Sequence, residues 1–189
     1  MNAMMNEQYA AIGMLEFTSI AAGMEAADRM VKAAGIEPVF FKTVCPGKFL
    51  AAVAGDVAAV AASLEAGRNA ALPVLADWFL IPNIHREVIA ALSGTGPHVD
   101  REALGIIETF SAASIIVAAD AAIKAAEVRI MDVRIALGLG GKGYALFCGD
   151  VAAVRAAVDA GAERASESGL LVAKVVIPRP AERFFEHLL

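Results

Sequence analysis

The sequence carries one pattern twice, and this internal repeat limits the possible folds more than any single motif does. Residues 11–16 (AIGMLE) return as residues 103–108 (ALGIIE), 92 positions later. Residues 55–60 (GDVAAV) return unchanged as residues 149–154, 94 positions later, so two residues have been added between these segments in the second copy. A duplication of this kind is typical of a chain that folds into two similar structural units, each built from one copy.

Both copies predict the same order of elements: strand, helix, strand, strand, helix, strand and a short closing helix. Short apolar runs suggest the strands, and a serine or an aspartate stands at each main helix start, where it can cap the free amides. Strands are predicted at 10–17, 37–44, 49–55 and up to 82, and at 103–110, 129–137, 142–148 and up to 178. Helices are predicted at 19–34, from 56, at 86–92, at 111–126, from 150 and at 181–188.

This order predicts an α+β fold of ferredoxin-like type, in which an antiparallel sheet carries helices on one face. The first copy is expected to form a domain over residues 9–93, and the second copy a domain over residues 102–189. Residues 94–101 between them contain two glycines and a proline, which are typical of a linker.

The composition excludes several classes of protein. Hydrophobic residues make up 58% of the chain, but no uncharged run reaches the roughly 18 residues that a membrane-crossing helix needs. We therefore expect a soluble protein whose excess apolar surface is covered by subunit contacts. The first residues lack the basic and apolar regions of a signal peptide, which predicts a cytoplasmic location. A net charge of −5 without a basic block argues against nucleic acid as a partner.

Several spaced motifs point to one family. They are ALGIIET at 103–109, AAD at 118–120, KAA at 124–126, GDV at 149–151 and VIPRP at 176–180. In this order they resemble the signature of bacterial microcompartment (BMC) shell proteins. Because the match spans both copies, the chain resembles the members that carry two BMC domains in tandem. The resemblance implies a homotrimer that forms a pseudohexameric tile and joins other shell proteins edge to edge.

Residues of the first copy narrow the resemblance further. Residues 42–49 (KTVCPGKF) and 83–85 (NIH) are similar to the propanediol-utilisation subgroup of these shell proteins. That subgroup is known for an iron–sulfur cluster at the centre of the trimer. The resemblance thus implies a cofactor-binding site at Cys45, with Pro46 and Gly47 beside it.

One cysteine in a chain cannot hold such a cluster, because a cluster or a tetrahedral metal needs three or four ligands. If the turn that contains Cys45 points at a threefold axis, three thiolates meet there. A 4Fe-4S cube has threefold symmetry about a body diagonal, so three thiolates can bind three irons equivalently. Zinc could also bind three cysteines. Leu137 is aligned with Cys45 in the second copy, so we expect three thiols per trimer.

By itself, an isolated cysteine is more often a small buried side chain than a metal ligand, and it is the resemblance that implies a metal ligand at Cys45. An isolated cysteine in an apolar strand usually packs as a hydrophobe, and Cys148 fits that description. Cys45 is followed by a Pro-Gly turn, which bends the chain sharply and would let main-chain amides approach the sulfur. Lys42 and Lys48 would add positive charge that favours the thiolate form.

A glycine-rich turn takes the place of the Cys45 turn in the second copy. It does not match a phosphate-binding loop, which would need a glycine at position 136 and a hydroxyl residue at position 143. Its residues, together with Lys48, are interpreted as the lining of a pore. They are Gly138, Leu139, Gly140 and Gly141.

Other charged residues have a structural explanation. Lys32 and Lys124 each follow an aspartate by four positions, which predicts an ion pair along a helix. The resemblance implies in addition that both lysines, beside Arg179, lie at the tile edge and contact a neighbouring tile. Glu16 and Glu108 stand at matching strand ends, where we expect structural hydrogen bonds rather than acid–base catalysis.

These features predict a structural shell protein without enzymatic activity. Its cluster is expected to carry electrons across the shell, between enclosed redox enzymes and the cytosol. Two alternatives remain open. One is a metal-free shell tile whose central pore passes or excludes small metabolites. The other is an enzyme or regulatory domain in which the repeat forms a small-molecule cleft.

Overall fold

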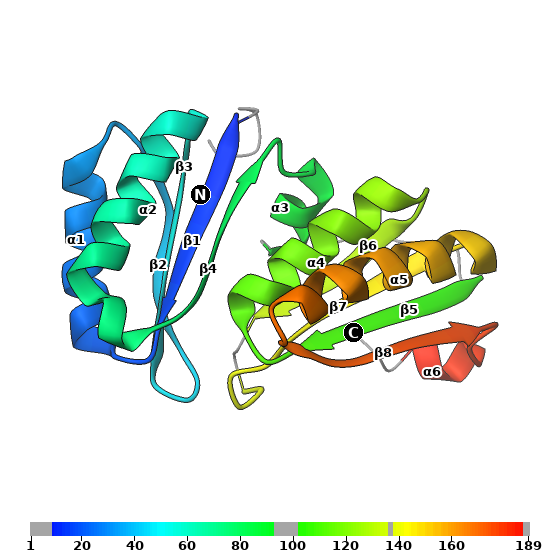
Figure 1. Cartoon of the computed structure of the whole chain (residues 1–189). Coiled ribbons are helices and arrows are strands. Elements are labelled where there is room, and N and C mark those ends of the chain that lie inside the picture. The colour runs from blue at the N-terminus through cyan, green and yellow to red at the C-terminus, as the bar shows by residue number, and fades with distance from the viewer. Residues whose placement is uncertain (1–8, 93–101, 136–137, 187–189) are drawn as a thin grey trace. The chain divides into compact units, whose positions relative to one another are not determined.

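The computed structural model of the chain describes residues 9–92, 102–135 and 138–186 (Figure 1). It divides into two units. The first unit comprises Met1–Arg86, Ser111–Ala113 and Ala136–Gly141, and the second comprises Glu87–Phe110, Ser114–Ile135 and Lys142–Leu189. The predicted linker at 94–101 lies outside the described residues. In the part that is described, no helix is both long and apolar enough to pass through a lipid bilayer.

The first unit contains a four-stranded antiparallel sheet covered on one face by two helices. Strands β1 (Ala11–Phe17), β2 (Glu37–Val44), β3 (Lys48–Gly55) and β4 (Leu75–Pro82) pair in the order β2-β3-β1-β4. Helices α1 (Ile20–Ala33) and α2 (Val57–Ala71) lie on the same face (Figure 1), and the 3-10 helix η1 (Leu72–Val74) leads into β4. Two predicted caps are present, because Ser19 accepts the N–H of Ala22 and Asp56 accepts that of Ala59.

The second unit repeats this sheet. Strands β5 (Ala103–Thr109), β6 (Arg129–Ile135), β7 (Gly143–Gly149) and β8 (Leu171–Pro178) pair in the order β6-β7-β5-β8. The main helices are α4 (Ala112–Ala125) and α5 (Val151–Glu167), and the short ones are α3 (Arg86–Leu92) and α6 (Glu182–Glu186). Both sheets are antiparallel with the strand order of a ferredoxin-like fold, which confirms the predicted fold class.

The duplication extends to the irregular points of the sheets. The register shifts after Glu16 in β1 and after Glu108 in β5, and again after Pro38 in β2 and after Ile130 in β6. Bulges of this kind are local features that each strand must encode. Ile12 of β1 pairs with Ile81 of β4, and Leu104 of β5 pairs with Ile177 of β8 in the same way. Matching residues therefore lie 92 positions apart in the first strand of each copy and 96 positions apart in the last. Residues of the matching strands and main helices can therefore be assigned counterparts in the other copy.

At one equivalent site, the two cores place the small and the large residue on opposite elements, a helix in one unit and a strand in the other. In the first unit, a Cβ added to Gly23 of α1 would lie 2.8 Å from the Cβ of Phe49. The counterparts in the second unit are Ile115 and Gly143, and a Cβ added to Gly143 would lie 2.5 Å from Cγ2 of Ile115. Glycine on the helix is thus matched by a large residue on the strand, and the reverse, so that both cores stay close-packed.

Exchanging these sizes in the first unit is expected to reveal coupling between the two positions. Gly23→Ile alone should overpack the site, and Phe49→Gly alone should leave a cavity. The double variant copies the second unit, so its loss of stability should be smaller than the sum of the single losses by about 0.5–3 kcal/mol. Hydrogen exchange of α1 in the three variants measures the losses, and simple additivity would contradict the packing argument.

Candidate functional site

The thiol of Cys45 lies at the tip of the hairpin that joins β2 to β3. The N–H of Gly47 donates to the carbonyl oxygen of Val44 at 3.0 Å, which closes a tight turn around Cys45 and Pro46. Gly47 has a φ of +80°, a left-handed conformation that favours glycine. Cys45 is exposed and forms no disulfide. The turn therefore presents one thiol on the surface of the first unit.

The glycine-rich turn of the second copy lies against the Cys45 turn, within the first unit. A Cβ added to Gly141 would lie 3.0 Å from Cδ of Pro46 and 3.5 Å from Nζ of Lys48. The structure thus brings the predicted cofactor turn and the predicted pore turn together. Left-handed φ angles occur at Gly138 (+71°), Gly140 (+61°) and Gly141 (+89°), with Leu139 half-buried between them.

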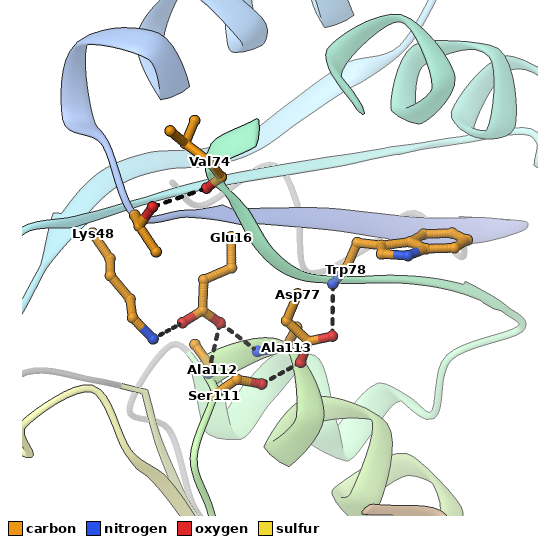
Figure 2. A network of polar contacts seen from close by, with 9 residues as sticks. Glu16, Lys48, Val74, Asp77, Trp78, Ser111, Ala112 and Ala113 are labelled. Carbon is orange, nitrogen blue, oxygen red and sulfur yellow. Dashed lines mark hydrogen bonds and ion pairs between the residues drawn. The ribbon is translucent and has the colours of Figure 1, made fainter. Parts of the chain in front are cut away.

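Glu16 forms a buried polar centre with Lys48, the first residue of β3 after the Cys45 turn (Figure 2). Its side chain is 0% exposed, and its Oε1 lies 2.7 Å from Nζ of Lys48, whose side chain is 17% exposed. Its Oε2 accepts hydrogen bonds from the N–H groups of Ala112 at 2.8 Å and Ala113 at 3.1 Å. These amides open helix α4 and have no partner inside the helix. The structural role predicted for Glu16 is confirmed.

Asp77 and Ser111 extend this centre (Figure 2). The hydroxyl of Ser111 donates to Oδ2 of Asp77, and Oδ1 of Asp77 accepts the N–H of Trp78 at 2.8 Å. The guanidinium of Arg68 lies 4.0 Å from the ring of Trp78. Sequence reasoning missed this set, because Asp77 and Ser111 are 34 positions apart and neither belongs to a binding motif.

The second copy contains the same ion pair, but there both side chains are more exposed to solvent. Nζ of Lys142 lies 2.9 Å from Oε1 of Glu108, and these residues are the counterparts of Lys48 and Glu16. Glu108 is 33% exposed and Lys142 is 41% exposed. Since the two pairs have the same geometry, their difference in burial reflects what lies over them.

The groups expected to favour the thiolate of Cys45 are engaged elsewhere in the first unit. The ammonium of Lys48 is paired with Glu16, and the N–H of Gly47 is used inside the turn. Burial lowers the pKa of the Lys42 ammonium from its ordinary value, and its Nζ lies 4.3 Å from the ring of Phe40.

The described residues of one chain offer an incomplete ligand set for a metal. Within residues 9–92, 102–135 and 138–186, no three His, Cys, Asp or Glu side chains are grouped so that they could hold a metal ion. Cys148 in β7 is buried, with its Sγ 3.6 Å from the carbonyl oxygen of Arg129. A metal at Cys45 would need ligands beyond these residues. Leu137, the predicted counterpart of Cys45, lies outside the described residues.

The helix lysines form the ion pairs that their spacing predicts. Nζ of Lys32 lies 2.6 Å from Oδ2 of Asp28, and Nζ of Lys124 lies 2.6 Å from Oδ2 of Asp120. The first pair is exposed on α1, whereas Asp120 is buried. Arg179 is exposed directly after β8, with a φ of +53°. A role of these residues at a tile edge stays a prediction.

Comparison with known proteins finds the same repeat. The model of the BMC domain matches residues 11–84 and again residues 103–180. The chain is 47% identical over 179 residues to the bacterial microcompartment shell protein PduT of Citrobacter freundii, covering 95% of this chain and 97% of that protein. It is 51% identical over 79 residues to the shell protein EutM of Salmonella typhimurium, covering 42% of this chain and 80% of EutM.

Solved structures show the same arrangement of elements. A microcompartment protein from Desulfitobacterium hafniense matches with a TM-score of 0.82 and 48% identity, covering 93% of this chain and 98% of that one. The fused permuted hexameric shell protein MSM0275 of the RMM microcompartment matches with a TM-score of 0.63 and 21% identity, covering 82% and 83%. The second similarity concerns the fold alone.

Proposed function

We propose that this chain, which belongs to the BMC-domain family of bacterial microcompartment shell proteins, forms a trimeric tile that holds an iron–sulfur cluster on its threefold axis. Two BMC domains and similarity to PduT along nearly the whole chain make it a structural shell protein. The proposal adds the trimer, the cluster and electron transfer across the shell. The observation that carries it is the exposed thiol of Cys45 on a turn that meets its own counterpart.

The contact between the two turns supports a ring. Within the first unit, the Cys45 turn lies against residues 138–141, which take its place in the second copy. A contact between two different surfaces of a repeat is head-to-tail, and such contacts close into a ring when the rotation per step divides a full turn. If the same contact joins the second copy of one chain to the first copy of the next, three Cys45 turns alternate with three glycine turns.

The donor set is of the kind that holds an iron–sulfur cluster. Thiolate sulfur is the ligand that iron–sulfur clusters use, and one Cys45 from each chain would supply three equivalent ligands. Among the described residues, no three His, Cys, Asp or Glu side chains are grouped so that they could hold a metal ion within one chain. A bound cluster would supply one-electron transfer. Each of the three chains would contribute one sulfur and the rigid turn that holds it.

Replacing the thiol tests the proposal directly. Protein purified without oxygen should be brown, with visible absorption that a reductant bleaches, and should contain about four iron atoms per trimer. Cys45→Ala should lose the colour and the iron completely, because it removes every ligand, yet remain a trimer. Absorption spectra, iron and sulfide analysis and sedimentation measure these outcomes.

The matched control is Cys148→Ala, which removes the buried cysteine and should keep the cluster. If the wild-type trimer contained zinc and no iron, the cluster proposal would be wrong and Cys45 would bind a structural metal instead. A metal-free trimer prepared under the same conditions would favour the tile whose pore passes or excludes small metabolites.

A further inference from the structure

Helix α3 makes a charged contact with β6 inside the second unit. Nε of Arg129 lies 3.0 Å from Oε1 of Glu87, and the N–H of Ile130 donates to Oε2 of Glu87 at 3.2 Å. Glu87 follows the last strand of the first copy, whereas Arg129 and Ile130 begin the second strand of the second copy. Like the contact of Glu16 with the start of α4, this contact joins residues that belong to different copies of the repeat.

The counterparts of these residues carry reversed charges. The repeat assigns Arg183 to Glu87, Glu37 to Arg129 and Pro38 to Ile130. Arg183 and Glu37 are exposed, and within the described part of the chain neither forms an ion pair. Pro38 has no N–H to donate, and a guanidinium, unlike a carboxylate, accepts none. The three differences together keep the contact possible with its sign reversed.

Among the described residues, the polar centre around Glu16 has counterparts that do not make the contact between a carboxylate and helix amides. The carboxylate is Glu108, which pairs with Lys142, and the amides are the first two of α1, at Ile20 and Ala21. In the part of the chain that the structure describes, Ser19 caps α1 by accepting the N–H of Ala22, and the amides of Ile20 and Ala21 have no acceptor there. A carboxylate on one surface and two free amides on another surface repeat the two halves of the Glu16 contact.

We propose that these surfaces meet between neighbouring copies of the chain. Arg183 of one copy pairs with Glu37 of the next, and Glu108 of the first accepts the N–H groups of Ile20 and Ala21 of the second. The inference rests on the proposed trimer and names the residues that hold it. Its support is that two separate contacts inside the chain map, through one correspondence, onto two sets of complementary groups.

The reversed signs also favour alternation of the two copies around the ring. If α3 approached the first copy instead of the second, Glu87 would face Glu37. If α6 approached the second copy, Arg183 would face Arg129. Both arrangements place like charges together, which disfavours the wrong pairing. Alternation is what spaces the Cys45 turns equally.

Charge reversal tests the ion pair. Glu37→Arg and Arg183→Glu should each weaken the trimer by roughly fivefold per contact, hence roughly a hundredfold over three contacts, because each places like charges together. The double variant restores opposite charges and should recover most of the association. Sedimentation over a dilution series measures the dissociation constant. The control is the reversed pair Glu25→Arg with Arg29→Glu, an exposed pair on α1 that should change nothing.

A proline tests the amide contact without removing a side-chain charge. Ile20→Pro removes one amide hydrogen at the first helical position, where proline is well tolerated, and the extended conformation of Ser19 before it suits a proline. The variant should weaken the trimer several-fold while α1 keeps its hydrogen-exchange protection. Ile20→Ala removes the side chain but keeps the amide, and so separates the two contributions.

The outcomes distinguish this inference from the function on which it rests. A wild-type trimer whose dissociation is unchanged by the charge reversals and by Ile20→Pro would overturn the assigned contacts and leave the tile intact. A double variant no stronger than the single variants would overturn the pairing of Arg183 with Glu37. A wild-type chain that stays monomeric at every concentration would overturn the ring itself.

Discussion

Glu16→Ala is expected to lower the free energy of unfolding of the first unit by about 3–5 kcal/mol. The carboxylate is fully buried and has three partners, namely the ammonium of Lys48 and the amides of Ala112 and Ala113. Its removal leaves a largely buried cation and two helix-opening N–H groups without an acceptor, and each unsatisfied buried group is costly. Hydrogen exchange of β1 and of the first turn of α4 would measure the loss.

Two further variants serve as comparisons for Glu16→Ala. Lys48→Met keeps the apolar stem of the lysine and leaves Glu16 bonded to the amides, so its cost should be smaller, about 1–3 kcal/mol. Asp28→Ala removes an exposed carboxylate from the pair with Lys32 and should cost less than about 1 kcal/mol. If Glu16→Ala were as mild as Asp28→Ala, the polar centre would contribute nothing to stability.

Gly161→Ala is expected to destabilise the second unit by about 3 kcal/mol, because α5 has no room for a side chain where it crosses α4. A Cβ on Gly161 would lie 2.6 Å from the carbonyl oxygen of Ala118 and 2.6 Å from Cδ1 of Ile107. The backbone oxygen cannot move unless helix α4 moves with it. The loss should appear as faster hydrogen exchange along α4 and α5, with the protection of α1 and α2 unchanged.

The counterpart Gly67→Ala supplies the matched control. There a Cβ would meet Cδ1 of Leu15 and Cγ of Met30, both at 2.6 Å, and no backbone atom is among its nearest neighbours. Side chains can change rotamer, and methionine is especially adaptable, so the cost should be only about 1 kcal/mol. Equal losses at Gly161 and Gly67 would show that the backbone contact is not the cause.

The elements of both copies could be predicted because their signals are local. Ser19 and Asp56 act on amides within three positions, and Pro82 ends the strand that contains it. The α+β fold follows once these elements are placed in order, since few arrangements of four strands and two helices bury the apolar faces. Where the predicted ends lie among the described residues, they match or differ by one residue, whereas the predicted ends at 137 and 188 lie outside the described residues; helix η1 was missed.

The candidate site could be predicted only in part. The thiol of Cys45 and the glycine-rich turn were found because unusual residues stand in short turns. The ion pair of Lys48 with Glu16 could not be predicted, because Glu16 lies 32 positions away and was considered separately. The pairing of Glu87 with Arg129 had no sequence signal, since neither residue is unusual in its own segment.

The sequence by itself determined the duplication, the order of elements and the presence of one thiol in a turn, because caps, turns and alternation depend on residues a few positions apart. Only the tertiary structure decided that Glu16 caps α4, that Gly141 lies against Pro46 and that Gly23 is matched by Phe49. These contacts depend on which distant segments the packing of sheets and helices brings together, and on the burial that results. The sequence gives the charge of a side chain, but the fold determines which residue it contacts.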